Sequence, residues 1–353
     1  MDSSTTWARV ARLASEGHPA TSLCWRGDDL VDWARGGATW TAERGFVAAG
    51  RSWGYGRLNA ATTDPTGRWA VVHERTGTAG LLLRDGQVVR ELHRSLYHAD
   101  AYDYPVCLFS GPARRTLLAH CPDSYARLEI DDAETGERLT RSPARKEADF
   151  FHSRLAVSPG SRRLLSAGWV WHPWDAVVWF DLSAALGDPT LLDALEGASC
   201  SRNVCLAEES SAAWLDDDRL LLGGSGAPED PEEAAWANRE YPGPRLCPNG
   251  LAIYDTALRR YVASLELGYP PGAMMPVGPQ HVVTFFQHPR LVSLASGKVV
   301  HEWADLATGE AVSSIVLDRP QPVLALDPPR ARFAVGSPGG IDVVTIDVAK
   351  LPP

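Results

Sequence analysis

Ser158-Pro159-Gly160-Ser161-Arg162-Arg163-Leu164-Leu165 is the stretch that decides the fold, because its arrangement returns along the whole chain. A turn rich in Pro, Gly, Ser or Asp is followed by a basic or polar residue and then by a short apolar run. Five further clear copies begin near positions 64, 110, 215, 277 and 327, and a weaker copy begins near Arg26. Self-similarity along a chain indicates a repeat architecture, so seven copies predict seven structural units.

The apolar runs that follow each marker are short, as in Val177-Val178-Trp179-Phe180-Asp181 and Leu251-Ala252-Ile253-Tyr254-Asp255. They are bounded by Gly, Pro and Asp, which favours strands because helices need longer periodic segments. A polar turn and another extended stretch complete each unit, so we expect four strands per unit. The runs are apolar on both faces, which is typical of a sheet covered on both sides by other layers.

Seven four-stranded antiparallel sheets stacked radially form a seven-bladed β-propeller, and we expect this all-β fold as a single domain over residues 1–353. A blade of roughly 40–45 residues leaves room for insertions in a chain of this length. The widest interval between markers contains a segment rich in Pro and Glu, at about 223–250, which we expect to be an inserted loop.

The last unit lacks one strand, because little sequence follows its third apolar run, Val343-Val344-Thr345-Ile346-Asp347. We expect residues 7–13 (Trp-Ala-Arg-Val-Ala-Arg-Leu) to supply the missing outer strand and so to join the two ends of the ring. Closing a sheet in this way removes exposed edges. A short amphipathic helix on the surface is the alternative, because Arg and Ala suit helices well.

The repeat pattern resembles that of the WD40/YVTN-like seven-bladed β-propellers, in a divergent form without their strict Gly-His and Trp-Asp pairs. The resemblance covers essentially the whole chain. Residues 97–105 and 167–175 are similar to stretches of bacterial propeller proteins for which no activity is established. Because one fold hosts many functions, the resemblance implies an architecture and not a reaction.

Composition excludes several classes of protein. With 34 basic and 44 acidic residues the formal charge is −10, so we expect neither a nucleic acid nor an anionic membrane as partner. No apolar run approaches the roughly 18 residues of a membrane helix, and the first seven residues lack the features of a secretory signal. Six cysteines are too few to staple the chain, so we expect reduced thiols in a cytoplasmic protein, with a bridge between Cys200 and Cys205 as the alternative.

One face of the expected propeller gathers the chemistry-bearing side chains. Loops joining second to third strands share this face with the connections between blades, and such loops on a rigid scaffold often bind ligands. Six of the ten histidines fall on it: His73, His98, His120, His152, His172 and His288. The candidate ligand- or partner-binding residues are His98, Asp100, Tyr102, Asp103, Asp149, His152, Trp171, His172, Trp174, Asp175, Arg202, Asn203 and His288.

Two local groups on this face admit more than one interpretation. Asp149 and His152 could form a carboxylate-oriented base near the central channel, but a buried structural hydrogen bond suits the histidine equally well. His172, between two tryptophans, could stack on a ligand or only close a packed loop. Asp100 and its neighbours match neither a calcium loop nor a zinc site, so we expect no metal and no other cofactor.

These observations favour a non-catalytic, monomeric cytoplasmic propeller that binds a protein or peptide across its His/Trp-rich loop face. The chain has no nucleophile elbow, phosphate-cradling loop or dinucleotide fingerprint. The alternative is an enzyme, a hydrolase of lactonase-like type or a lyase, with a His/Asp site at the mouth of the channel. A further alternative is a sensor that holds a small molecule in the central channel without turnover.

Overall fold

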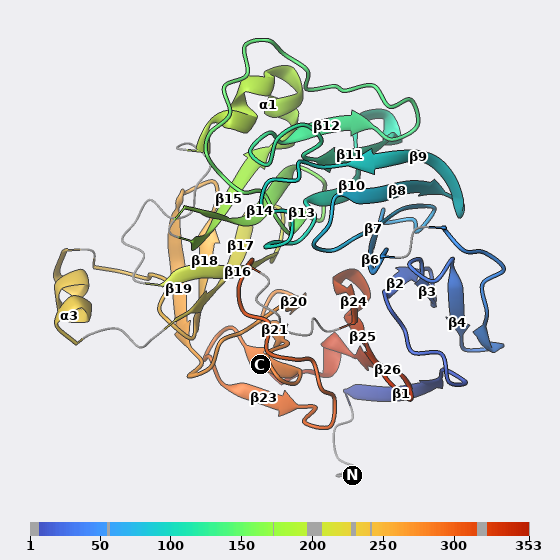
Figure 1. Ribbon diagram of the computed structural model, residues 1–353. Coiled ribbons are helices and arrows are strands. Elements are labelled where there is room, and N and C mark those ends of the chain that lie inside the picture. The colour runs from blue at the N-terminus through green and yellow to red at the C-terminus, as the bar shows by residue number, and fades with distance from the viewer. Residues whose placement is uncertain are drawn as a thin grey trace.

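The computed structural model describes residues 7–54, 57–171, 173–195, 207–226, 231–240, 242–315 and 323–352. Seven antiparallel sheets stand around a common centre in the order of the chain (Figure 1). In six of the sheets the strands lie in the order of the chain, and in the seventh the first strand of the chain lies beside the last. The seven-bladed, all-β propeller predicted from the repeats is confirmed.

The first three blades come from the N-terminal half of the chain. Blade 1 contains β2 (Cys24–Arg26), β3 (Asp29–Asp32), β4 (Ala38–Thr41) and β5 (Gly45–Val47). Blade 2 contains β6 (Ala60–Thr63), β7 (Trp69–His73), β8 (Ala79–Arg84) and β9 (Gln87–His93). Blade 3 contains β10 (Val106–Ser110), the 3-10 helix η1 (Pro112–Arg114), β11 (Thr116–His120) and β12 (Glu129–Asp132).

The next three blades include the α-helices α1 and α3. Blade 4 contains β13 (Leu155–Val157), β14 (Arg163–Val170) and β15 (Trp174–Asp181), followed by α1 (Leu182–Gly187) and η2 (Pro189–Asp193). Blade 5 contains β16 (Glu208–Trp214), β17 (Arg219–Ser225), α3 (Pro231–Glu240), β18 (Gly250–Asp255) and β19 (Arg260–Glu266). Blade 6 contains β20 (Met274–Val277), β21 (His281–Thr284), β22 (Arg290–Ser293) and β23 (Val299–Glu302).

Blade 7 combines both ends of the chain. It contains β24 (Leu324–Asp327), η3 (Pro328–Arg330), β25 (Arg332–Ser337), β26 (Gly340–Ile346) and then η4 (Val348–Lys350), with β1 (Ala8–Ala14) as its outer strand. The antiparallel register of β1 on β26 runs from Ala8 opposite Ile346 to Ala14 opposite Gly340. The N-terminal segment is therefore the strand that the sequence predicted and not the alternative surface helix.

Two blades have three strands in the described part of the chain, where the sequence analysis expected four. After β12, the Asp132 carboxylate accepts hydrogen bonds from the backbone N–H groups of Glu134 and Thr135, and the chain turns away with only an isolated bridge to Arg138. After β15, Asp181 caps α1 through the N–H of Ala184. Asp is a strong helix cap, and it redirects the chain of blade 4 from a strand into a helix.

The inserted segment of blade 5 also differs from its prediction as a loop. It joins β17 to β18, as expected, but it contains the ten-residue helix α3, which projects from the ring at the left of Figure 1. Pro231 at the first helical position suits a helix start because its missing N–H is not needed there. The alanines that follow favour continuation of the helix.

Arginines of the repeated marker connect neighbouring blades. Arg332, at the start of β25, lies 3.0 Å from Asp28 in the first turn of blade 1 and 3.9 Å above the ring of Trp25. Arg163, at the start of β14, pairs in the same way with Asp218 in the first turn of blade 5. The arginine of the marker therefore forms an ion pair with the next blade, in addition to following the turn that precedes the strand.

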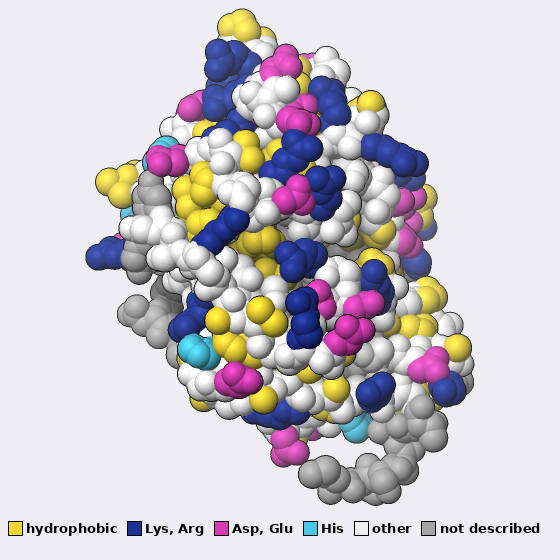
Figure 2. Space-filling model, turned by 90° about the vertical axis from the view of Figure 1, so that its right-hand side faces the viewer, with side chains coloured by type: hydrophobic (Ala, Val, Ile, Leu, Met, Phe, Trp, Pro, Cys, Tyr) yellow, Lys and Arg dark blue, Asp and Glu magenta, His cyan; other side chains and the backbone are white. Residues whose placement is uncertain are grey.

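The core consists of apolar layers between adjacent sheets. Val71 and Leu82 of blade 2, for example, pack in one buried cluster with Leu108 and Leu118 of blade 3. This packing explains the runs that are apolar on both faces. On the outside, the view in Figure 2 shows basic and acidic side chains interspersed, so that side of the molecule carries no field of a single sign.

Candidate binding face

An exposed group of aromatic rings lies on the loop side of blades 2 to 4. We define the aromatic patch as Tyr97, His98, Tyr125 and Trp171. Tyr97 lies 6.3 Å from Trp171 and 5.1 Å from Tyr125 between ring centroids, and His98 lies 5.3 Å from Trp171. Tyr97 and Trp171 are 48% and 41% exposed, and the neighbouring Leu96 is 81% exposed. Three separate connections therefore build one apolar surface.

The patch rests on a buried aromatic stack. Tyr125 stacks on Phe151 with centroids 4.1 Å apart, and Phe151 stacks on Trp169 with centroids 3.7 Å apart. The ring of Tyr102 meets Phe151 edge-on at 5.7 Å. Each aromatic pair contributes about 0.5–1.5 kcal/mol beyond its burial. The exposed rings are thus held in place from below.

Arg94 fixes the loop that presents Tyr97 and His98. Its side chain is buried, and it donates hydrogen bonds to the carbonyl oxygens of Gly77, Ala99, Tyr102 and Asp103. The guanidinium also lies 4.5 Å from the ring centroid of Tyr102. Burial lowers the pKa of Arg94. Sequence reasoning missed this residue, because its carbonyl partners come together only when the loop is folded.

The candidate residues of the sequence analysis separate into accessible and inaccessible sets. The exposed ones on this face are His98, Asp100, Asp149, Trp171 and Trp174. The buried ones, Tyr102, His152 and Asp175, cannot contact a partner directly, which corrects their candidacy as contact residues. Asp103 is partly buried and pairs with Arg75, and His288 is partly exposed and lies 3.3 Å from Glu302. His172, Arg202, Asn203, Cys200 and Cys205 lie outside the described residues.

Asp149 and His152 do not act together. Asp149 accepts a hydrogen bond from the Tyr125 hydroxyl at 2.8 Å, whereas Nδ1 of His152 lies 3.1 Å from Oγ of Ser166. Burial lowers the pKa of His152 to about 3, so the ring is neutral at physiological pH. The structural interpretation of this histidine is the one that the geometry supports.

The expectation of a histidine-rich surface is wrong in part. His73, His120 and His152 are buried, and Nε2 of His120 lies 3.0 Å from Oδ2 of Asp131. Burial lowers the pKa of His73 to about 3. Both His73 and His120 are the last residues of central strands, and the ring of His73 packs against Tyr104 with centroids 5.1 Å apart. The accessible part of the face is therefore mainly aromatic.

A segment that the sequence analysis did not anticipate crosses the ring on this side. We call residues 309–315 the strap. Gly309 forms an isolated bridge with Gln287 of blade 6, and Ile315 forms one with Tyr102, before blade 3. Ser314 donates its hydroxyl to Asp175 and its backbone N–H to the same carboxylate at 2.9 Å. The strap reaches the middle of the ring in Figure 1, and it explains why Asp175 is unavailable.

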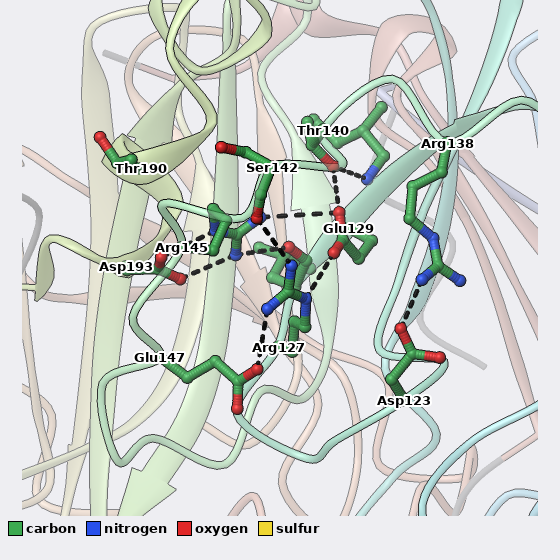
Figure 3. A network of polar contacts seen from close by, with 12 residues as sticks. Asp123, Arg127, Glu129, Arg138, Thr140, Ser142, Arg145, Glu147, Thr190 and Asp193 are labelled. Atoms are coloured by element: carbon green, nitrogen blue, oxygen red, sulfur yellow. Dashed lines mark hydrogen bonds and ion pairs between the residues drawn. The ribbon is translucent and has the colours of Figure 1, made fainter.

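A buried ion network connects the loops on either side of β12 with η2 (Figure 3). Arg145 donates to both oxygens of Asp193, each at 2.8 Å, and neither side chain is more than 6% exposed. The fully buried Glu129 accepts a hydrogen bond from Arg127 at 2.6 Å and another from Thr140. The network joins the chain after β12 to η2, so ionic contacts take the place of the missing outer strands.

The described part of the chain shows neither a metal-binding cluster nor a membrane-spanning helix. Within the described ranges, no three or more His, Cys, Asp or Glu side chains are grouped so that they could hold a metal ion. None of the helices in that part of the chain is long and apolar enough to cross a membrane.

Comparison with known proteins identifies the architecture. No family model matches the sequence, and no curated protein does either. A chain in the crystal structure of the mitotic checkpoint complex is similar over 98% of this chain and 96% of its own, with 12% identity and a TM-score of 0.57. The shared feature is the propeller. At this identity the similarity concerns the fold alone, and the function of this propeller has to be argued from its own surface.

Proposed function

We propose that this propeller is a protein- or peptide-binding module that uses the aromatic patch as its contact surface. The observation that carries the proposal is that Leu96, Tyr97 and Trp171 are exposed together. The rings of Tyr97 and Trp171 lie close to each other and pack on the buried aromatic stack. Clustered exposed apolar side chains are typical of interaction sites. Trp and Tyr are the residues that most often dominate binding energy at protein interfaces.

The rigidity of the patch supports the same function. Arg94 ties the connection of Tyr97 to Gly77, before β8, by hydrogen bonds to four carbonyl oxygens, and Phe151 and Trp169 support the other rings. A partner would therefore immobilise few side chains on binding. Pre-organisation of this kind raises affinity because the entropy cost of ordering has already been met during folding.

The proposal includes a non-catalytic role for a monomer in the cytoplasm. Cys24, Cys107 and Cys121 are free and buried, and burial raises the pKa of Cys24 to about 12, which suits packed rather than reactive thiols. The separate partners of Asp149 and His152 favour binding over hydrolysis. A small molecule in the channel stays a prediction that no observed contact favours.

The test compares partner capture by the whole protein and by variants. Cross-linking in cells, followed by affinity purification, is carried out with wild-type protein, with Tyr97→Ala/Trp171→Ala, and with Val88→Ala/Val89→Ala as the matched control. The control removes exposed apolar groups from β9, at the rim of blade 2. We expect partners captured by the wild type and the control to be lost from the patch variant, while all three proteins remain folded and the patch variant loses only the stability of its aromatic pairs. Equal capture by all three proteins would overturn the proposal.

A further inference from the structure

We propose that the partner places an arginine or lysine side chain of a peptide segment on the aromatic patch. This inference rests on the proposed function and specifies the chemistry of the partner. Two independent observations lead to it, one concerning the carboxylates beside the patch and one concerning the faces of its rings.

The carboxylates beside the patch are incompletely neutralised. Asp100 and Asp149 are exposed, and neither has an ion-pair partner in the part of the chain that the structure describes. Asp100 belongs to the same connection as Tyr97, and Asp149 receives the hydroxyl of Tyr125. Asp149 therefore contacts the patch directly, and Asp100 follows His98 by two residues in the same exposed connection.

Other carboxylates of these loops are already paired. Asp103 lies 3.3 Å from Arg75, Glu147 lies 3.1 Å from Arg127, and Asp123 pairs with Arg138. The chain has 34 basic residues, all but three of them arginines, and, among the residues that the structure describes, the unpaired state of Asp100 and Asp149 differs from the paired state of these neighbours. Arginines of the chain therefore neutralise Asp103, Glu147 and Asp123, whereas Asp100 and Asp149 could pair with a cation supplied by a partner.

The faces of the patch rings are also without a cation. Elsewhere in the molecule guanidinium groups lie over aromatic rings, at 3.9 Å for Arg332 over Trp25 and at 5.3 Å for Arg84 over Trp69. Within the described residues, no such group lies over Tyr97, Tyr125 or Trp171. An exposed Trp or Tyr face attracts a cation through its quadrupole.

A basic side chain would satisfy both features at once. Its charge would lie over a ring of the patch and within the field of Asp100 and Asp149, while its methylene stem would cover Tyr97. An acidic segment would instead face two carboxylates of its own sign. Lys146 is an exposed cation of the neighbouring connection, but its backbone is bonded to Asp193 of η2, on the side of the ion network.

The experiment uses a phage-displayed library of random peptides selected on the full-length protein. Enriched peptides are synthesised, and their affinities are measured by fluorescence anisotropy. We expect a recurrent arginine or lysine next to an apolar residue. Trp171→Ala should lower the affinity at least about tenfold. Asp100→Asn and Asp149→Asn should each lower it about two- to fivefold, and this effect should shrink at high salt.

The variants are matched so that the outcome is decisive. Asparagine at position 149 keeps an oxygen that can accept the Tyr125 hydroxyl, and Glu43→Gln removes an equal charge on the opposite face, in the turn between β4 and β5. This inference would be overturned, and the proposed function kept, if the enriched peptides lost affinity for Trp171→Ala but carried no basic residue. The same holds if their affinity were unchanged by both Asp100→Asn and Asp149→Asn. Peptides that bind independently of Tyr97 and Trp171, or a selection without enrichment, would overturn both.

Discussion

Replacing Arg94 with alanine tests whether a single buried guanidinium organises the binding face. Arg94 is only 5% exposed and donates hydrogen bonds to four backbone carbonyl oxygens, among them Gly77 at 2.7 Å and Tyr102 at 3.0 Å. These carbonyls belong to two different connections, before β8 and before β10. Without the guanidinium, the loop that carries Tyr97 loses its common anchor.

The magnitude follows from the contacts. A hydrogen bond from a charged donor contributes about 1.5–3 kcal/mol, so four such bonds set an upper range of about 6–12 kcal/mol. Some of the carbonyls regain water when the side chain is removed, and the desolvation of the buried charge, which also lowers its pKa, is recovered. We therefore expect a net loss of about 2–4 kcal/mol in the free energy of unfolding.

Urea denaturation monitored by tryptophan fluorescence measures this loss, and amide hydrogen exchange locates it. Exchange should accelerate in residues 95–103 while β7 and β8 keep their protection. Arg94→Lys keeps a charge but lacks the fork of donors, so it should fall between the wild type and Arg94→Ala. Arg68→Ala, which removes an exposed pair with Asp85, should change stability little. If Arg94→Ala behaved like Arg68→Ala, Arg94 would not be the anchor of this loop.

Three further predictions concern the rest of the fold. The lowered pKa of His152, about 3 against 6.5 in the unfolded chain, contributes stability that is present above pH 6.5 and lost as the pH falls toward 3; His152→Gln should flatten this slope in denaturation curves between pH 7.5 and 4.5, and an unchanged slope would contradict the assignment. Asp193→Ala removes the carboxylate that accepts two hydrogen bonds from the buried Arg145 and leaves only Glu129, at 3.6 Å, opposite that charge, so it should cost about 3–5 kcal/mol, measured by urea denaturation; a loss below 1 kcal/mol would show that the network is not needed. Deleting residues 1–14 removes β1 and exposes the edge of β26, so light scattering should detect association; a deletion variant that stays monomeric with an unchanged melting temperature would show that ring closure does not depend on β1.

Local patterns in the sequence were enough to predict the ring. The markers before Arg163 and Arg332 signal a turn and a strand within a few residues, and the signal is repeated in every unit. Strand count per blade was less predictable, because Asp181 can end a strand or cap a helix, and the choice depends on what packs beside it. The histidines show the same limit, since one residue type is buried at His152 and exposed at His98.

The sequence by itself determined the seven repeats, the extended segment that completes the last sheet and the side of the ring where aromatic residues gather. The tertiary structure alone decided which side chains of that side remain accessible. Arg94, the strap and the stack on Trp169 draw partners from connections far apart along the chain. The physical reason is that the accessibility of a side chain depends on which distant segments cover it. The residues next to Asp175 do not predict that Ser314 donates a hydrogen bond to it.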